Sequence, residues 1–313
     1  MKFKTKCIPF YLLFFVVFIQ ACNTDISQDT DTPTSGVVTI MVDESFQKLF
    51  DTQIFTFHSI YPNAKINVKY LAEKEAMQML SNDSCKVIVI CRDLTKEERK
   101  HFESKNLFPI STKIAEDAIA IIVHPENIDN ELSIDNIKAM LLGKDSIWQQ
   151  LNAASQLGKI QIVFDNNGSA NARYMQDTLL GGKDFSKNVF AVKSNLDVIE
   201  YVSKNKNAVG FVSINWISDL DDPTVLNYLK SVKVLAIKRN INDVAYKPYQ
   251  AYIKTKDYPF TRSVYMINRQ TRAGLGKGIV SFVAGDKGQL MILKSGLVPA
   301  IAPVRLVNIN MEQ

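Results

Sequence analysis

Cysteine is scarce in this chain, which has four cysteines among its 313 residues. Cys7 and Cys22 lie in the N-terminal segment, and Cys85 and Cys91 flank the apolar run KVIVI. This run reads as a strand, which would hold the two cysteines ~20 Å apart at ~3.3 Å per residue. A disulfide requires Cα atoms within ~7 Å of each other. The sequence therefore predicts two buried free thiols.

Histidine is also scarce, and catalytic motifs are absent. His58, His101 and His124 lie in separate segments and lack the spacing of metal ligands. The chain has no G-x-S-x-G, H-E-x-x-H, C-x-x-C or P-loop motif, because GLGKG at 274–278 lacks the P-loop spacing and the Ser or Thr after Lys. We therefore expect a protein that is not an enzyme and that has no metal and no cofactor.

A large charge imbalance is missing as well. The formal charge of +5 includes three lysines and no acids in residues 1–21, so it falls to about +2 without them. A chain so close to balance gives no reason to expect nucleic acid as a partner.

The N-terminal residues have the layout of a secretory signal: three lysines, an apolar run from Ile8 to Ile19, and Ala21 before Cys22. The apolar run is short for a transmembrane helix. The ending IQAC resembles a bacterial lipobox, which implies cleavage before Cys22, a lipid on its thiol and a place in the bacterial cell envelope. A plain signal peptide with a chance cysteine is the alternative. Residues 22–36 are polar and read as a flexible tether.

Strands and helices alternate from residue 37 onward. VVTIMV, AKINVKY and KVIVIC read as strands, with helical periodicity between them, and Thr95 with Glu98 forms a capping box that opens another helix. A second series starts near residue 115 and includes a helix that begins at Ser169. Two such series predict an α/β fold of two lobes, with a ligand cleft at the carboxyl ends of the strands.

Four segments in order carry a family resemblance. DAIAIIVHPENIDNELSIDNIKAMLLGKDSIW, AVGFVS and YPFTRSVYMINRQTRAGLGKGIVSFVAGDKGQLMILKSGLVP resemble segments of the phosphate-binding proteins of bacterial ABC uptake systems, and VFDNNGSANARYM resembles their anion-binding turn. The resemblance implies a two-lobe type II periplasmic-binding-protein fold. Lobe 1 would comprise 37–114 with 262–313, and lobe 2 would comprise 115–261. It also implies a monomer that binds a small anionic or polar ligand, and an ABC permease as partner.

The family's ligand contacts map onto three loops of this sequence. The first holds Asp43, Glu44 and Ser45, and the second holds Arg92 and Asp93. The third runs from Asp165 to Asn171 and includes Gly168 and Ser169. Ser45 and Ser169 could instead serve only as helix caps, and Arg92 could be a solvated side chain.

Asp165 is a departure from the family pattern, because the family has an arginine at this position. An inward Asp165 would disfavour orthophosphate, whereas Arg173, one helical turn after Ser169, could reach toward the cleft. Arg173 could also lie on the surface or pair with Asp177. We therefore expect uptake of phosphate, a related oxyanion or another polar solute. The alternative is a surface lipoprotein that uses the same fold for ligand sensing or assembly.

Overall fold

The computed structural model describes residues 31–219 and 221–301. The predicted signal peptide, Cys22 and most of the predicted tether lie outside these residues. Within the described ranges, no helix combines the length and the apolarity that a membrane span requires.

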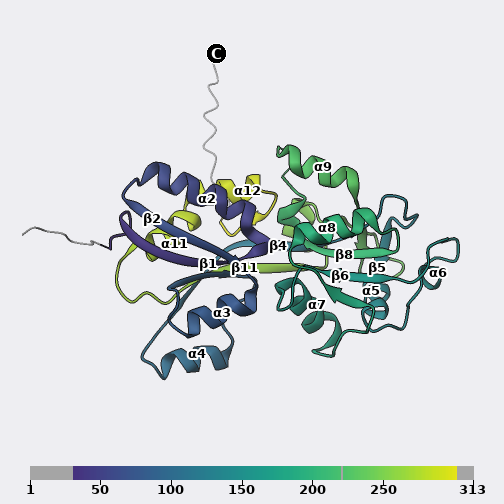
Figure 1. The fold of residues 1–313 in the computed structure, drawn as a ribbon, viewed down its shortest axis with the longest axis horizontal. Helices are drawn as coiled ribbons and strands as arrows, with labels where there is room; N and C mark the ends of the chain where they lie inside the picture. Colours follow the sequence, from purple (N-terminus) through teal and green to yellow (C-terminus); the bar gives the residue numbers. More distant parts are fainter. Residues whose placement is uncertain (1–30, 220, 302–313) are drawn as a thin grey trace, which may run out of the picture. The chain divides into compact units, whose positions relative to one another are not determined.

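A long mixed sheet forms the centre of the fold (Figure 1). Its strand order is β2-β1-β3-β11-β4-β8-β6-β7, with β12 and β9 also paired to β4. A separate pair joins β10 to β5. The strands are β1 (Gly36–Asp43), β2 (Ala64–Leu71), β3 (Val87–Ile90), β4 (Ile110–Val123), β5 (Glu131–Ser133), β6 (Gln161–Phe164), β7 (Val189–Ala191), β8 (Ala208–Ser213), β9 (Lys233–Val234), β10 (Ala236–Lys238), β11 (Thr261–Asn268) and β12 (Val298–Pro299).

Helices follow most strands, as the sequence predicts, and the capping box of Thr95 and Glu98 is confirmed. Ser169 is confirmed as the residue that caps its helix. The helices are α2 (Gln47–Ile60), α3 (Glu73–Ser81), α4 (Lys96–Glu103), α5 (Ile134–Leu141), α6 (Trp148–Leu151), α7 (Ala170–Leu180), α8 (Asn195–Lys204), α9 (Pro223–Ser231), α10 (Gln250–Lys254), α11 (Leu275–Ala284) and α12 (Asp286–Lys294), with short 3-10 turns η2 (Glu44–Phe46) and η3 (Ile214–Trp216).

Strand β4 differs from the sequence-based expectation. The expected strand began at residue 117, in a sheet separate from the first, whereas β4 is a single strand of 14 residues. Its first part pairs antiparallel with β11 and its last five residues pair antiparallel with β8. One strand therefore connects the two halves of the sheet, and the predicted lobe boundary at 114/115 falls inside it. The exact division into lobes stays a prediction.

The core lies on both faces of the sheet. In β3, Val87 and Val89 pack into the larger apolar cluster, which includes side chains of α2 and α11. Ile88 and Ile90 point the other way, into a smaller cluster with α3 and α4. The continuous apolar run in β3 thus follows from helices on both faces. Cys85 and Cys91 are free and buried, as predicted.

Candidate functional site

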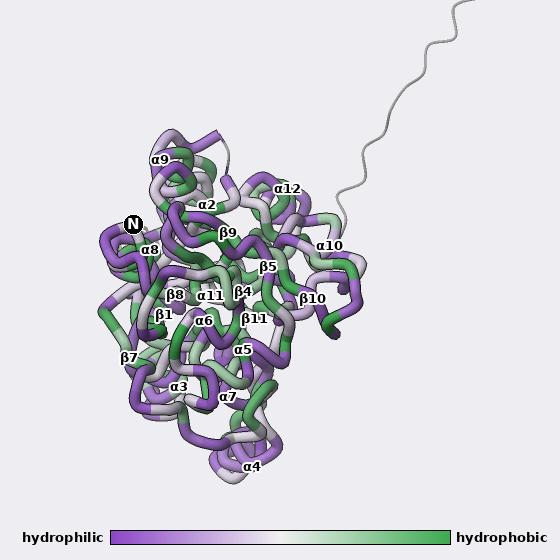
Figure 2. The backbone as a smooth tube through the Cα atoms, turned by 90° about the vertical axis from the view of Figure 1, so that its right-hand side faces the viewer, coloured by the Kyte–Doolittle hydropathy of each residue, from purple (hydrophilic) through white to green (hydrophobic). Residues whose placement is uncertain are grey.

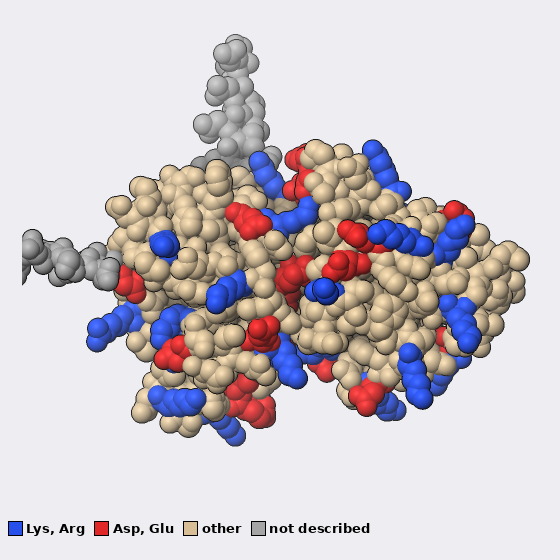
Figure 3. Space-filling view, viewed as in Figure 1, with Lys and Arg blue, Asp and Glu red and all other residues tan. Residues whose placement is uncertain are grey.

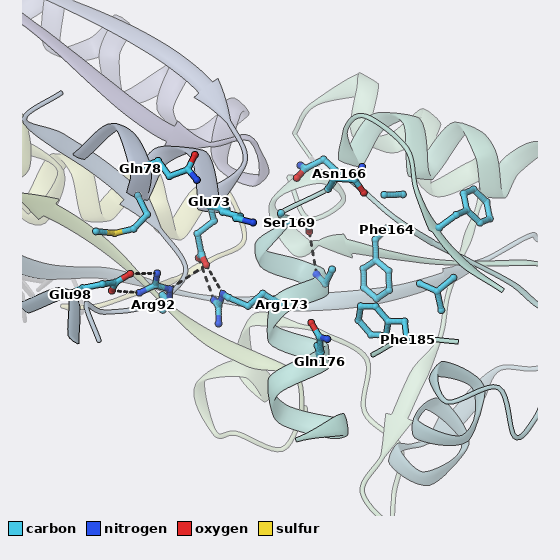
Figure 4. Close-up of a pocket in the computed structure, with 18 of the residues that line it drawn as sticks. Glu73, Gln78, Arg92, Glu98, Phe164, Asn166, Ser169, Arg173, Gln176 and Phe185 are labelled. Atoms are coloured by element: carbon cyan, nitrogen blue, oxygen red, sulfur yellow. Dashed lines mark hydrogen bonds and ion pairs between the residues drawn. The ribbon is translucent and has the colours of Figure 1, made fainter. Parts of the chain in front are cut away.

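A cavity of about 720 Å³ opens between α3 and α4 on one side and α7 and β7 on the other (Figure 4). We call it the central cleft. Four of the predicted ligand residues line it: Arg92, Gly168, Ser169 and Arg173. Its volume lies in the range of small-molecule sites, ~300–1,000 Å³.

One wall of the central cleft is aromatic. Phe164 and Phe185 stack with their ring centroids 5.3 Å apart, and Phe190 also lines this side. Figure 4 shows the Phe164 and Phe185 rings across the cavity from the charged side chains of α3 and the loop after β3. The cleft therefore combines an apolar wall with a charged one.

The junction between β6 and α7 places Asp165 and Ser169 together. Gly168 has a φ of +97°, which favours glycine, and a Cβ there would lie 3.2 Å from Cβ of Lys74. The Ser169 hydroxyl accepts hydrogen bonds from the amides of Asn171 and Ala172, at 3.0 and 3.2 Å, and donates one to the Asp165 carboxylate. Asp165 is 1% exposed. Its side chain thus lies inside the protein, beside the N-terminus of α7.

Asn195, the first residue of α8, connects the first and third predicted loops. Its side-chain amide donates to the Glu44 carboxylate at 2.7 Å and to the Asp165 carboxylate at 3.2 Å. Its backbone amide also donates to Glu44, at 3.2 Å. The N-terminus of a helix favours an anion, because its first amides have no partner within the helix. At the N-terminus of α8, the Glu44 carboxylate occupies the position that a bound anion would take.

Glu73, at the start of α3, binds both arginines of the cleft. Arg173 donates to it at 2.5 Å, Arg92 lies 3.5 Å away, and the Cys91 amide donates at 2.9 Å. Arg92 also makes a two-pronged pair with Glu98, at 2.7 and 2.8 Å. Both guanidiniums therefore already have carboxylate partners, as the dashed lines in Figure 4 show.

Five carboxylates gather behind the cleft, and we call them the acidic cluster: Asp43, Glu44, Glu73, Asp117 and Asp165. Arg262 is the buried cation beside them, and it binds Asp117 at 2.7 and 2.9 Å. Burial raises the pKa of both Asp43 and Glu44 to about 7, and also raises the pKa of Asp117 and Asp165. A carboxyl group deprived of water resists ionisation unless cations compensate it. Arginines pair with Glu73 and Asp117, whereas Asp43, Glu44 and Asp165 have no ion pair within the described residues.

The remaining predicted residues are separated from the open cavity. Ser45 and Asn171 are buried, and the Ser45 hydroxyl and the Asn171 side-chain oxygen have no hydrogen-bond partner within the described residues. Asp93 is 42% exposed and pairs with Arg99 on the surface. The structure thus brings Glu44, Asp165 and Asn171 together behind Ser169 of the cleft wall and leaves Asp93 outside.

Asp43, Glu73 and Cys91 place ligand atoms within 4.8 Å of one another. The Glu73 carboxylate is already bound by Arg173 and by the Cys91 amide, and the Asp43 carboxylate accepts from the Ser45 amide. These donors compete with a metal ion for the carboxylate oxygens. Burial raises the pKa of the Cys91 thiol, which disfavours the thiolate that a metal ion requires. The arrangement is therefore an internally bonded cluster, and we do not assign a metal to it.

Sequence reasoning missed Glu73, Asn195 and Asp117, and noted Arg262 only as part of a terminal signature. Glu73 resembles an ordinary acidic residue in the first turn of a helix, and Asn195 follows the capping Ser194 without a distinct motif. For Asp117 the sequence did offer a signal, because an acidic residue stands beside the apolar run of β4. A buried charged group of this kind needs a bonded partner.

Charges of both signs are interspersed on the face shown in Figure 3, without a large patch of either sign. A face of this kind produces little long-range steering of ligands.

Comparison with known proteins identifies the family. A family model for the PBP superfamily domain matches residues 27–287. The phosphate-binding protein PstS of Pseudomonas aeruginosa is 22% identical over 285 residues, covering 86% of this chain and 85% of that protein. PstS of Staphylococcus aureus is 24% identical over 205 residues, covering 63% of this chain and 58% of that protein.

Solved structures share the fold. A candidate phosphate ABC transporter substrate-binding protein from Clostridium perfringens, with bound phosphate, has a TM-score of 0.71 and 20% identity, covering 85% of this chain and 100% of its own. A phosphate transport receptor from Vibrio cholerae has a TM-score of 0.65 and 19% identity, covering 84% and 100%. The predicted two-lobe fold is confirmed. The chain belongs to the PBP superfamily domain family and is a PstS-like binding protein.

Proposed function

We propose that this protein is a lipid-anchored solute-binding protein of the bacterial cell envelope, which captures a small polar ligand between its lobes and delivers it to an ABC permease. The relatives support this proposal, because their names describe phosphate binding and ABC transport. The IQAC motif before Cys22 supports the lipid anchor. The family's fold supports closure of the two lobes around the ligand.

The ligand is a solute that presents hydrogen-bond donors, and bare orthophosphate is a poor fit. One observation carries this proposal: carboxylates of the chain itself lie at the N-termini of α7 and α8, where a bound anion would otherwise be stabilised. An incoming anion would have to approach Asp165 and Glu44. Two like charges 4 Å apart repel by ~4 kcal/mol at an effective dielectric of 20.

Titration calorimetry with inorganic phosphate at pH 8 tests the ligand class. The wild-type protein should bind phosphate in the millimolar range or not at all. Asp165→Asn keeps the shape of the side chain and removes its charge, so it should tighten phosphate binding at least tenfold. Glu200→Gln removes an exposed charge of α8 that pairs with Lys204, away from the cleft lining, and should change nothing. Micromolar phosphate binding by the wild type, unaffected by Asp165→Asn, would contradict the proposal.

Membrane partitioning tests the anchor. Cys22→Ala should release the protein from the membrane fraction or block its processing. A Cys22→Ala protein of normal size that partitions as the wild type does would show that the anchor lies elsewhere.

A further inference from the structure

A second pocket, of about 620 Å³, lies apart from the central cleft. It is formed by η3, the end of α9, β9, the segment 247–250 and Gly296, and it shares no lining residue with the central cleft. Figure 2 labels α9, β9 and α10, which contribute residues to this pocket. We call it the lysine-rimmed pocket.

The floor of this pocket is apolar. Ile214, Ile217 and Val232 line it and are 3–5% exposed, and the buried Pro248 lies beside them. The Tyr249 side chain, 61% exposed, also lines the pocket. A concave apolar surface with one aromatic ring at its edge suits a flat or chain-like hydrocarbon group.

The rim of the pocket is cationic. Lys230, Lys233 and Lys247 line it, and none of the described lining residues is acidic. The amines of Lys230 and Lys247 make no ion pair or side-chain hydrogen bond within the described residues. Partial burial lowers the pKa of Lys233, and Lys247 lowers it further while Asp129 opposes both. Lys247 therefore acts on Lys233 as a like charge.

Within residues 31–219 and 221–301, Lys233 is the one rim lysine with internal partners. Its amine donates to the backbone oxygen of Asn127 and, at 3.2 Å, to the side-chain oxygen of Asn130. These contacts hold its charge at the edge of the apolar floor. Among the described residues, Lys230 and Lys247 have no such partner, so their amines are available to a ligand.

We propose that the lysine-rimmed pocket is a second binding site, which takes a small amphiphilic anion with one carboxylate or sulfonate group and an apolar body. The head group contacts Lys230 and Lys247, and the body covers the floor beside Tyr249. A compact polyanion such as phosphate suits this pocket less well, because it would leave the apolar floor in water. This site is independent of the function proposed for the central cleft.

Fluorescence titration of the purified protein with 8-anilino-1-naphthalenesulfonate tests the site, with displacement by decanoate as the second step. The double variant Lys230→Gln/Lys247→Gln should weaken probe binding at least fivefold, and Tyr249→Ala should weaken it at least threefold. The matched control is Lys204→Gln, an exposed lysine of α8 that pairs with Glu200. It should bind the probe as the wild type does.

Decanol supplies the uncharged counterpart of decanoate and should displace the probe at least tenfold less well. Higher salt should weaken decanoate binding, since the head-group contact is electrostatic. The proposal is overturned by probe binding that does not saturate, by equal affinities of the double variant and the Lys204→Gln control, or by decanol that displaces the probe as well as decanoate.

Discussion

The central cleft and the lysine-rimmed pocket differ in whether their cations have partners. In the cleft, Arg92 and Arg173 are both bound to carboxylates of the chain. In the lysine-rimmed pocket, Lys230 and Lys247 have none within the described residues. The number of basic side chains in a pocket is therefore a poor guide to its preference for anions, because only uncompensated charge attracts a ligand.

The comparison also separates charges that are bonded inside the fold from charges that a ligand can reach. The acidic cluster behind the cleft is bonded through Asn195 and Arg262 and is part of the folded core. The rim lysines stand at the surface and contribute little to folding. Breaking the buried pair of Asp117 and Arg262 should thus destabilise the protein, whereas removing the rim charges should leave its stability unchanged.

The largest effect is expected for the buried pair of Asp117 and Arg262, whose side chains are 0% and 2% exposed. Asp117→Ala leaves a buried guanidinium without its carboxylate and should lower the free energy of unfolding by about 3–5 kcal/mol. Urea denaturation measures this change. Glu200→Ala breaks an exposed pair and is the control, which should unfold as the wild type does. Equal stability of the two variants would mean that Arg262 is not held by Asp117.

The next largest effect is expected for the dependence of the free energy of unfolding on pH. The pKa of Asp43 and of Glu44 rises from 3.8 and 4.5 to about 7 on folding, because burial disfavours the charged form. Between about pH 4.5 and 7 the folded protein therefore binds more protons than the unfolded chain. The stability that the two groups contribute is complete below that window and is lost as the pH rises through about 7.

The free energy of unfolding should accordingly fall between about pH 5 and pH 7, by ~1.4 kcal/mol per pH unit for each excess proton. Urea denaturation at several pH values measures the slope. The double variant Asp43→Asn/Glu44→Gln should flatten it, whereas Lys230→Gln/Lys247→Gln should leave it as in the wild type. A wild-type stability that rises over this window would show that the two carboxyls are ionised in the folded state.

Much of the fold follows from local sequence signals. The capping box at Thr95 and the cap at Ser169 are read from neighbouring residues, and the four apolar residues of β3 predict a strand covered on both faces. The continuity of β4 could not be read in this way. Residues 110–116 become a strand by pairing with β11, about 150 residues later in the chain, and that partner is not visible in local periodicity.

The site was predicted less completely for the same reason. Asp165 and Ser169 are four residues apart, so their contact is local. The contact between Arg173 and Glu73 spans 100 residues, and that between Asn195 and Glu44 spans 151 residues. Only tertiary structure decides which carboxylate compensates which guanidinium, and these pairings determine the charge that a ligand meets.

A smaller effect is expected for Arg173, which is 31% exposed and joins α7 to Glu73 of α3. Arg173→Ala removes a charged hydrogen bond from the buried Glu73 and should lower the free energy of unfolding by about 1–2 kcal/mol. Asp177→Asn removes the exposed partner of the same arginine and should change it by less than ~0.5 kcal/mol. If both variants cost the same, the contact with Glu73 adds nothing to stability.

The smallest effect is expected at the lysine rim. Lys230→Gln/Lys247→Gln removes two charges that have no partner in the described part of the chain, so the free energy of unfolding should stay within ~0.5 kcal/mol of the wild type. Any change should be stabilising, because Lys247 acts on the partly buried Lys233 as a like charge. Urea denaturation of the same variant that is used for probe binding gives the result directly. A loss of more than ~1 kcal/mol would mean that these lysines support the fold, as the charges behind the central cleft do, and that weaker probe binding reflects a damaged pocket.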